Sequence, residues 1–303
     1  MGRRLGQSVD EEFLEWIDER GDRPFFAFLN YFDAHLPYEP PPPFDTLFGP
    51  PRPESSVLER LEEVARGRTF WSDITKEELA AELAAYENSI AYLDHRLGIL
   101  YDELARRDLI DNTIIVLTSD HGEEFLEHGD HEHGSNLYLP QLHVPLVVLY
   151  PGHVPAGVRI QEPVSLQHLP STLEELSGLS DSIRFPGRSL SDWWANSPQE
   201  DGDLARETAY SELKVGTGRS AKMYSIIVDR HHYIRNPDGR GELYEIFADP
   251  AERSDLATAA ADAVEVWSGA LDNVLNCADP ACCCQVPESV RLPSPSRRPQ
   301  PEQ

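Results

Sequence analysis

Residues 113–134 read TIIVLTSDHGEEFLEHGDHEHG, a short apolar run that leads directly into acidic residues and histidines. The β-branched stretch from Thr113 to Thr118 is typical of a buried strand in a parallel sheet. Asp120 and His121 follow at the point where that strand should end. Because ligands of open α/β sheets bind beyond the carboxyl ends of the strands, this pair is predicted to bind a divalent metal ion.

A second interpretation of the same residues is the start of a helix. Asp120 and Glu123 are three positions apart, which is the spacing of a capping box. A capping box would explain both acidic residues. It would give no role to His121 or to the three histidines that follow in the same loop, so a binding site is the favoured interpretation.

The first two thirds of the chain alternate between helical and strand patterns. Residues 25–32 are apolar on both faces, as expected of an interior strand, and residues 144–150 predict a second buried strand. Helices are predicted for residues 9–20, 75–107 and 164–179. This alternation predicts an α/β domain over residues 1–200, with a mixed, mostly parallel sheet flanked by helices.

The pattern changes after residue 200. Short alternating segments predict an antiparallel sheet with strands at 208–213, 221–229, 232–235 and 242–247, followed by a helix at 258–275. Residues 201–276 are therefore predicted to form a small α+β subdomain. Residues 277–303 contain all four cysteines and many prolines, and this composition predicts a disordered tail without chemistry.

The composition excludes several classes of partner. A net charge of −27 argues against binding to nucleic acid. No run of about 18 apolar residues is present, so no transmembrane helix is predicted. An anionic substrate would have to be attracted by a local cation or histidine cluster. Neither the cellular compartment nor the oligomeric state follows from the sequence.

Four motifs together resemble the sulfatases of the alkaline phosphatase superfamily. Besides the TSDHG segment, they are FFAFLNYFDAHLPYEPP (25–41), HGSNLYLPQLHVPLVVLYPG (133–152) and GELYEIFADPAERSDLA (241–257). They occur in the order that the family shows. The resemblance implies an alkaline-phosphatase-like fold and a hydrolase that cleaves sulfate esters with the help of a divalent metal ion.

The resemblance also implies roles for individual residues. Asp120 and His121 correspond to metal ligands. His35 matches the histidine that hydrogen-bonds the bound sulfate, and His133 lies where the family has a lysine or a histidine. His35 and His133 are thus predicted to be catalytic and substrate-binding, with His128 or His131 as alternatives to His133. Calcium is the favoured ion, and the histidine ligand leaves manganese, zinc and magnesium open.

The family's nucleophile is not found in this sequence. Sulfatases make it from the cysteine of a C-x-P-S-R motif near the first strand, upstream of the segments matched here. The only Pro-Ser-Arg of this chain is at 295–297, and Pro293 occupies the nucleophile position. The chain is therefore expected to represent the C-terminal part of a sulfatase and to be inactive alone. The alternatives are a phosphoryl, phosphonate or phosphoethanolamine enzyme of the same superfamily, or a non-catalytic sulfatase-like chain.

Overall fold

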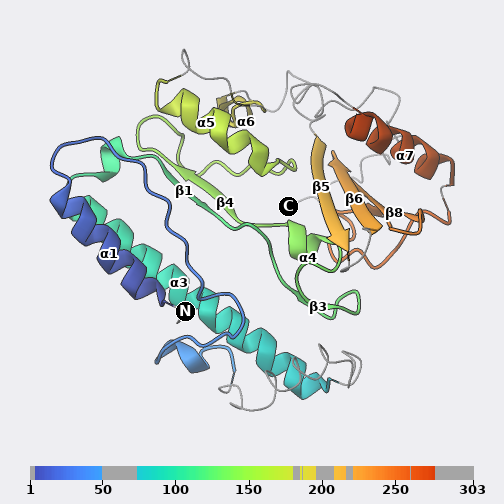
Figure 1. The fold of residues 1–303 in the computed structure, drawn as a ribbon, viewed down its shortest axis with the longest axis horizontal. Coiled ribbons are helices and arrows are strands. Elements are labelled where there is room, and N and C mark those ends of the chain that lie inside the picture. The colour runs from blue at the N-terminus through green and yellow to red at the C-terminus, as the bar shows by residue number, and fades with distance from the viewer. Residues whose placement is uncertain are drawn as a thin grey trace, which may run out of the picture. The chain divides into compact units, whose positions relative to one another are not determined.

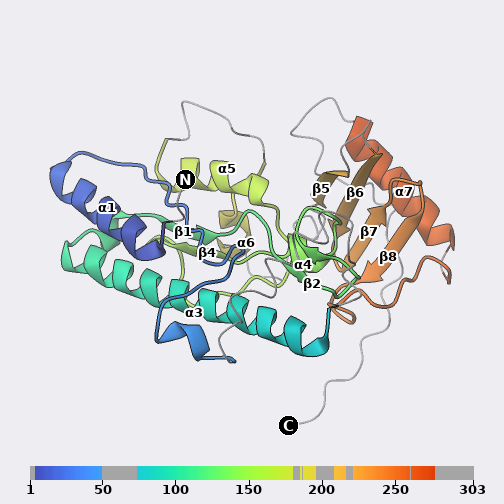
Figure 2. The same cartoon turned by 60° about the horizontal axis from the view of Figure 1, so that its bottom comes forward.

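The computed structural model of the chain describes residues 4–49, 74–179, 185, 187–195, 208–215, 221–259 and 261–276. The chain divides into two compact units (Figures 1 and 2). The first unit is drawn from residues 1–113 and 125–131, and the second from residues 114–124 and 132–303. The predicted domain boundary at residue 200 and the predicted tail at 277–303 lie outside the described residues.

The first unit is built on two helices that lie side by side, α1 (Gly6–Glu19) and α3 (Lys76–Arg106) (Figure 1). Both helices were predicted within a few residues. Thr75 caps α3 through a reciprocal pair of hydrogen bonds with Glu78, which together form a capping box. The short helices η1 (Phe44–Thr46) and η3 (Ile110–Asn112) complete this unit.

The buried face of α3 includes polar residues, and some of its large apolar residues are exposed. Leu83 and Ile90 are 40% and 44% exposed. Asn88 is buried instead, because its side chain accepts a hydrogen bond from the Phe48 amide and donates one to the Asp45 carbonyl oxygen. The face of α3 toward the η1 segment therefore carries Asn88, a residue that apolar periodicity cannot identify as buried.

A buried ion pair joins the two helices to the segment that carries His35. Asp10 of α1 is fully buried, and Arg96 of α3 approaches its carboxylate at 2.7 Å. Tyr31 donates a hydrogen bond of 2.6 Å to the other oxygen of Asp10. Burial and this carboxylate raise the pKa of Tyr31 above its usual range, so the phenol stays a donor at all physiological pH values.

Residues 25–32 do not form the interior strand that the sequence predicted. The segment is extended, but it takes part in none of the sheets of the described residues. Phe26 and Phe28 are 80% and 81% exposed. An apolar pattern on both faces predicts burial of the side chains. A strand also needs a neighbouring strand to which its backbone can form hydrogen bonds. The described residues supply no such strand here.

In the second unit, β1 (Ile115–Thr118) pairs with β4 (Leu146–Leu149). The α/β class is confirmed, and this pair runs antiparallel, as the predicted mixed sheet allows. Parallel neighbours need a crossover connection, which is usually a helix. The connection here contains only β2 (Glu124–Phe125), β3 (His131–Glu132) and the four-residue helix α4 (Leu139–Leu142).

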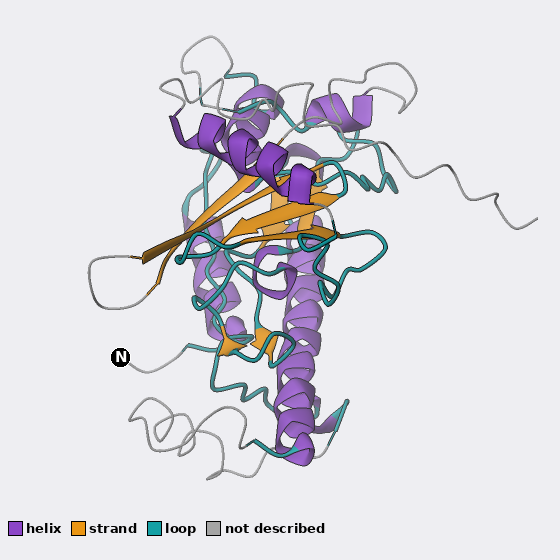
Figure 3. Cartoon of the chain, turned by 90° about the vertical axis from the view of Figure 1, so that its right-hand side faces the viewer, coloured by secondary structure: helices purple, strands orange, loops and turns teal. Residues whose placement is uncertain are grey.

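The predicted C-terminal antiparallel sheet and the helix that follows it are confirmed. Four antiparallel strands form one sheet, and α7 (Ala261–Asn276) covers one face of it (Figure 3). Trp267 and Leu271 of α7 pack with Ile226 and Leu243 in the core between helix and sheet. The strands are β5 (Thr208–Val215), β6 (Ala221–Val228), β7 (His231–Arg235) and β8 (Gly241–Glu245).

Three further helices precede this sheet along the chain: η4 (Leu166–His168), α5 (Leu169–Leu176) and α6 (Ser191–Ala195). The first two occupy the predicted helical stretch 164–179. Among the described helices, none combines the length and the apolar character needed to cross a membrane.

A buried carboxylate connects the C-terminal sheet to the segment before α4. Glu242 of β8 is 2% exposed. Tyr138 and Tyr244 each donate a hydrogen bond of 2.7 Å to one of its oxygens, and Asn236 donates one of 2.7 Å to the other. Burial alone would raise the pKa of Glu242, but these hydrogen bonds outweigh it and hold the pKa below the usual value.

Replacing Glu242 by Gln is expected to lower the free energy of unfolding by about 2–3 kcal/mol at pH 7, because hydrogen bonds to a charged acceptor are lost. A depressed carboxyl pKa contributes stability above its unfolded value of about 4.3, and this contribution disappears as the pH falls through the folded pKa. The difference between wild type and E242Q in urea unfolding should therefore shrink toward pH 3.

The matched control is E265Q on the exposed side of α7, where a change of less than about 0.5 kcal/mol is expected. A cost for E242Q that stays constant between pH 7 and pH 3 would contradict an ionised, hydrogen-bonded Glu242.

Candidate functional site

The end of β1 presents Asp120 and His121 in an open loop. The Asp120 side chain is 88% exposed, and it accepts a hydrogen bond of 3.1 Å from the adjacent His121 amide. Residues 119–138, all of which are described, contain no helix, so the capping-box interpretation is wrong. The nearest Asp120 oxygen lies 3.8 Å from Nε2 of His121. An ion about 2.0–2.6 Å from each donor fits between them.

The orientation of His121 leaves Nε2 available as a ligand. Its Nδ1 lies 2.8 Å from the carbonyl oxygen of Gly122. An Nδ1–H that donates to this oxygen fixes the tautomer in which Nε2 carries the lone pair.

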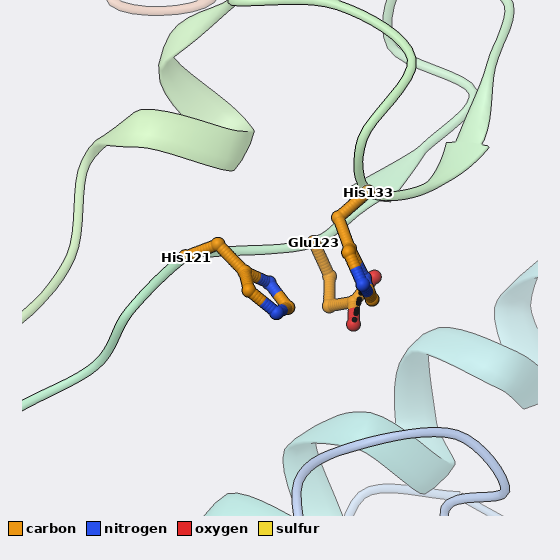
Figure 4. A group of neighbouring side chains, drawn as sticks. All are labelled: His121, Glu123 and His133. Atoms are coloured by element: carbon orange, nitrogen blue, oxygen red, sulfur yellow. Dashed lines mark hydrogen bonds and ion pairs between the residues drawn. The ribbon is translucent and has the colours of Figure 1, made fainter. Parts of the chain in front are cut away.

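Two further side chains converge on His121. The rings of His121 and His133 stack with centroids 3.7 Å apart and an interplanar angle of 27°, and Glu123 lies beside them (Figure 4). Nδ1 of His133 is 3.1 Å from Oε1 of Glu123. The Glu123 side chain is 4% exposed, whereas the side chains of the two histidines are 30–32% exposed. One donor atom from each of the three residues lies within 4.8 Å of the others.

Gln141 of α4 holds the two chain segments of this cluster together. Its side-chain oxygen accepts a hydrogen bond of 2.8 Å from the Gly134 amide, and its nitrogen donates one of 3.1 Å to Glu124. Its backbone carbonyl accepts a hydrogen bond of 2.8 Å from the Gly122 amide. The neighbours of Glu123 on both sides and the loop after His133 are thus tied to one residue.

Gly122 is required by the closeness of this contact. A Cβ atom at this position would lie 2.1 Å from the carbonyl oxygen of Pro140. The glycine that follows Asp120 and His121 therefore allows α4 to approach the loop of the site, and a side chain there would separate them.

Helix α4 is fixed in turn by Glu252. One carboxylate oxygen of Glu252 accepts a hydrogen bond of 2.7 Å from the Leu139 amide, and the other lies 2.5 Å from Nδ1 of His232. Glu252 and His232 are both buried. Sequence analysis considered Glu123 only as a capping residue and did not single out Glu124, Gln141 or Glu252. For Glu252 the available signal was its place in the GELYEIFADPAERSDLA motif.

His35 lies in the first unit. Its ring stacks on Phe32 with centroids 4.7 Å apart, and its Nδ1 lies 2.8 Å from the carbonyl oxygen of Leu36. Its convergence with the residues of the second unit stays a prediction. His131 also belongs to the first unit, where it is buried and packs edge-on against Phe125.

Comparison with known proteins identifies relatives over most of the chain. A sulfatase from Formosa agariphila is 29% identical over 261 residues, which are 80% of this chain and 49% of that protein. Arylsulfatase K of Canis lupus familiaris is 28% identical over 200 residues, which are 61% of this chain and 35% of that protein. The chain thus spans at most about half the length of these relatives.

The structure of a phosphonate monoester hydrolase from Agrobacterium radiobacter has the same fold. It superposes with a TM-score of 0.68 at 25% sequence identity, covering 89% of this chain and 59% of the hydrolase. The sulfatase family model matches residues 3–179. This match includes more than half of the chain and every residue of the cluster around His121, and the chain belongs to the sulfatase family.

Proposed function

We propose that this chain is part of a sulfuric ester hydrolase in which Asp120 and His121 bind a divalent cation, while His35 and His133 bind and protonate the ester. The observation that carries the proposal is the convergence of Asp120, His121 and His133 at the end of β1. The sulfatase and arylsulfatase K relatives support the sulfate ester as the substrate class.

The chemistry of ester hydrolysis explains the need for this combination. Negative charge on the sulfuryl oxygens must be stabilised, and the leaving oxygen needs a proton or a cation. A bound divalent ion supplies charge stabilisation. If Nδ1 of His133 donates its proton to Glu123, 3.1 Å away, the ring is held in one orientation with Nε2 directed elsewhere, as an imidazole that serves an ester must be.

The types of donor atom bear on the identity of the cation. The exposed carboxylate of Asp120 suits calcium or magnesium, whereas the imidazole of His121 suits manganese or zinc. We propose calcium as the resident ion, with the other three as alternatives. Two protein ligands leave most of the coordination sphere to water and substrate, so binding to this chain should be weak.

A phosphate or phosphonate ester is the second candidate substrate, and the phosphonate monoester hydrolase structure favours it. The genomic sequence immediately upstream of the codon for Met1 distinguishes the candidates. An open frame that encodes C-x-P-S-R supports the sulfatase, and a threonine nucleophile supports the phosphoryl enzyme. A frame with neither supports a non-catalytic chain.

The variant D120N is expected to weaken calcium or manganese binding by the full chain about 10-fold or more, because it removes the only charged ligand of the pair. Isothermal titration calorimetry measures this change. The control is D130N, a loop position outside the pair. Equal affinities for D120N and wild type would contradict the assignment of Asp120 as a ligand.

The 303-residue chain is expected to hydrolyse aryl sulfates several orders of magnitude more slowly than a sulfatase with its nucleophile, since none of its cysteines begins a C-x-P-S-R motif. The measurement compares aryl sulfate, aryl phosphate and phosphonate monoester turnover by wild type and H35A. Rapid turnover that H35A abolishes would refute this expectation and would show that a residue of this chain attacks the ester.

A further inference from the structure

We infer that His121, Glu123 and His133 form a binding site for a transition metal ion of the zinc type, separate in its donor set from the Asp120–His121 pair. The inference rests on the proposed function in one respect: His121 is a ligand in both donor sets. These three residues are called the His-Glu-His cluster below.

The spacing of the donors fits a metal ion. Donors that each lie about 2.1 Å from zinc are about 3.0–3.4 Å apart for angles between 90° and tetrahedral. Oε1 of Glu123 and Nδ1 of His133 are already 3.1 Å apart. The stacked ring of His121 brings a third donor, and all three lie within 4.8 Å of one another. The two rings must turn out of their stacked arrangement so that their in-plane lone pairs meet at one ion.

The residues around the cluster hold it in place and bury part of it, unlike a group of mobile surface side chains. Glu123 is buried, and Gln141 holds the residues on both sides of it, through the Gly122 amide and the Glu124 carboxylate. The two imidazoles are about one-third exposed. An ion can therefore reach the cluster from solvent and keep water on its remaining coordination positions.

The donor types select the class of ion. Two imidazoles and one carboxylate are the ligand set of many catalytic zinc sites, and imidazole favours zinc, cobalt and nickel. Calcium prefers six to eight oxygen ligands, and this cluster offers a single carboxylate. The cluster should thus bind zinc or cobalt much more tightly than calcium.

An ion bound at the His-Glu-His cluster prevents an ion from binding at the Asp120–His121 pair at the same time. His121 cannot direct its lone pair at both ions, and His133 is withdrawn from any ester. Zinc is therefore expected to displace calcium from Asp120 and His121 and to act as an inhibitor of an enzyme that contains this chain.

The test is a titration of the full 303-residue chain with Co²⁺, followed by the visible absorption of the bound ion. Wild type should show saturable ligand-field bands that Zn²⁺ abolishes and Ca²⁺ leaves unchanged. E123Q and H133N should each weaken Co²⁺ binding at least about 10-fold. Circular dichroism establishes that each variant is folded. H153A is the matched control, because His153 is an exposed histidine of the same unit that stacks on Tyr150.

The variant D120N separates this inference from the proposed function. If D120N keeps the Co²⁺ bands while it loses calcium affinity, both the cluster and the Asp120–His121 pair are supported. If D120N removes the bands and E123Q and H133N keep them, cobalt binds at the Asp120–His121 pair, and the inference is overturned while the proposed function stands. Saturable bands in wild type that none of the variants changes would also overturn it.

Discussion

The site depends on the hydrogen bonds that Gln141 forms with two segments of the preceding loop, at Gly122 and Glu124 and at Gly134. Glu124 is completely buried, and its carboxylate takes donors from Asn136 and Gln141. A buried carboxylate without such partners would cost several kcal/mol. The loop can therefore adopt only conformations in which residues 122–124 and 134–136 both reach α4. His121 and His133, twelve residues apart along the chain, are brought together as a consequence.

The C-terminal sheet contributes to the site at a distance, through support rather than chemistry. Glu242 and Glu252 belong to one sequence motif, and both direct a buried carboxylate at the turn that starts α4, through Tyr138 and the Leu139 amide respectively. Because buried carboxylates tolerate few geometries, the turn is held firmly on the sheet.

Local pattern was sufficient for the helices and for the C-terminal sheet, and it named Asp120 and His121 as candidates. His35 and His133 were singled out by the resemblance to the sulfatases. Local pattern failed for features that depend on which other segments pack beside a strand. Residues 25–32 have the composition of a buried strand, yet Phe26 and Phe28 are exposed, because composition says nothing of which backbone lies alongside. The direction of β4 relative to β1 could not be predicted for a similar reason, because it depends on the path of the 119–145 connection.

Glu123 shows how a functional residue can be seen and misassigned. Its spacing of three from Asp120 suggested a capping box, a helical relation. In an extended chain the relevant spacing is two, since alternate residues point to the same side, and His121 and Glu123 have this spacing. The conformation of a segment, extended or helical, thus decides which acidic side chain lies on the same side as which histidine. Here Gly122 decides it: without a Cβ it lets the carbonyl oxygen of Pro140 approach, and its amide bonds to Gln141. The loop at His121 is held in the non-helical form that turns Glu123 toward the two imidazoles.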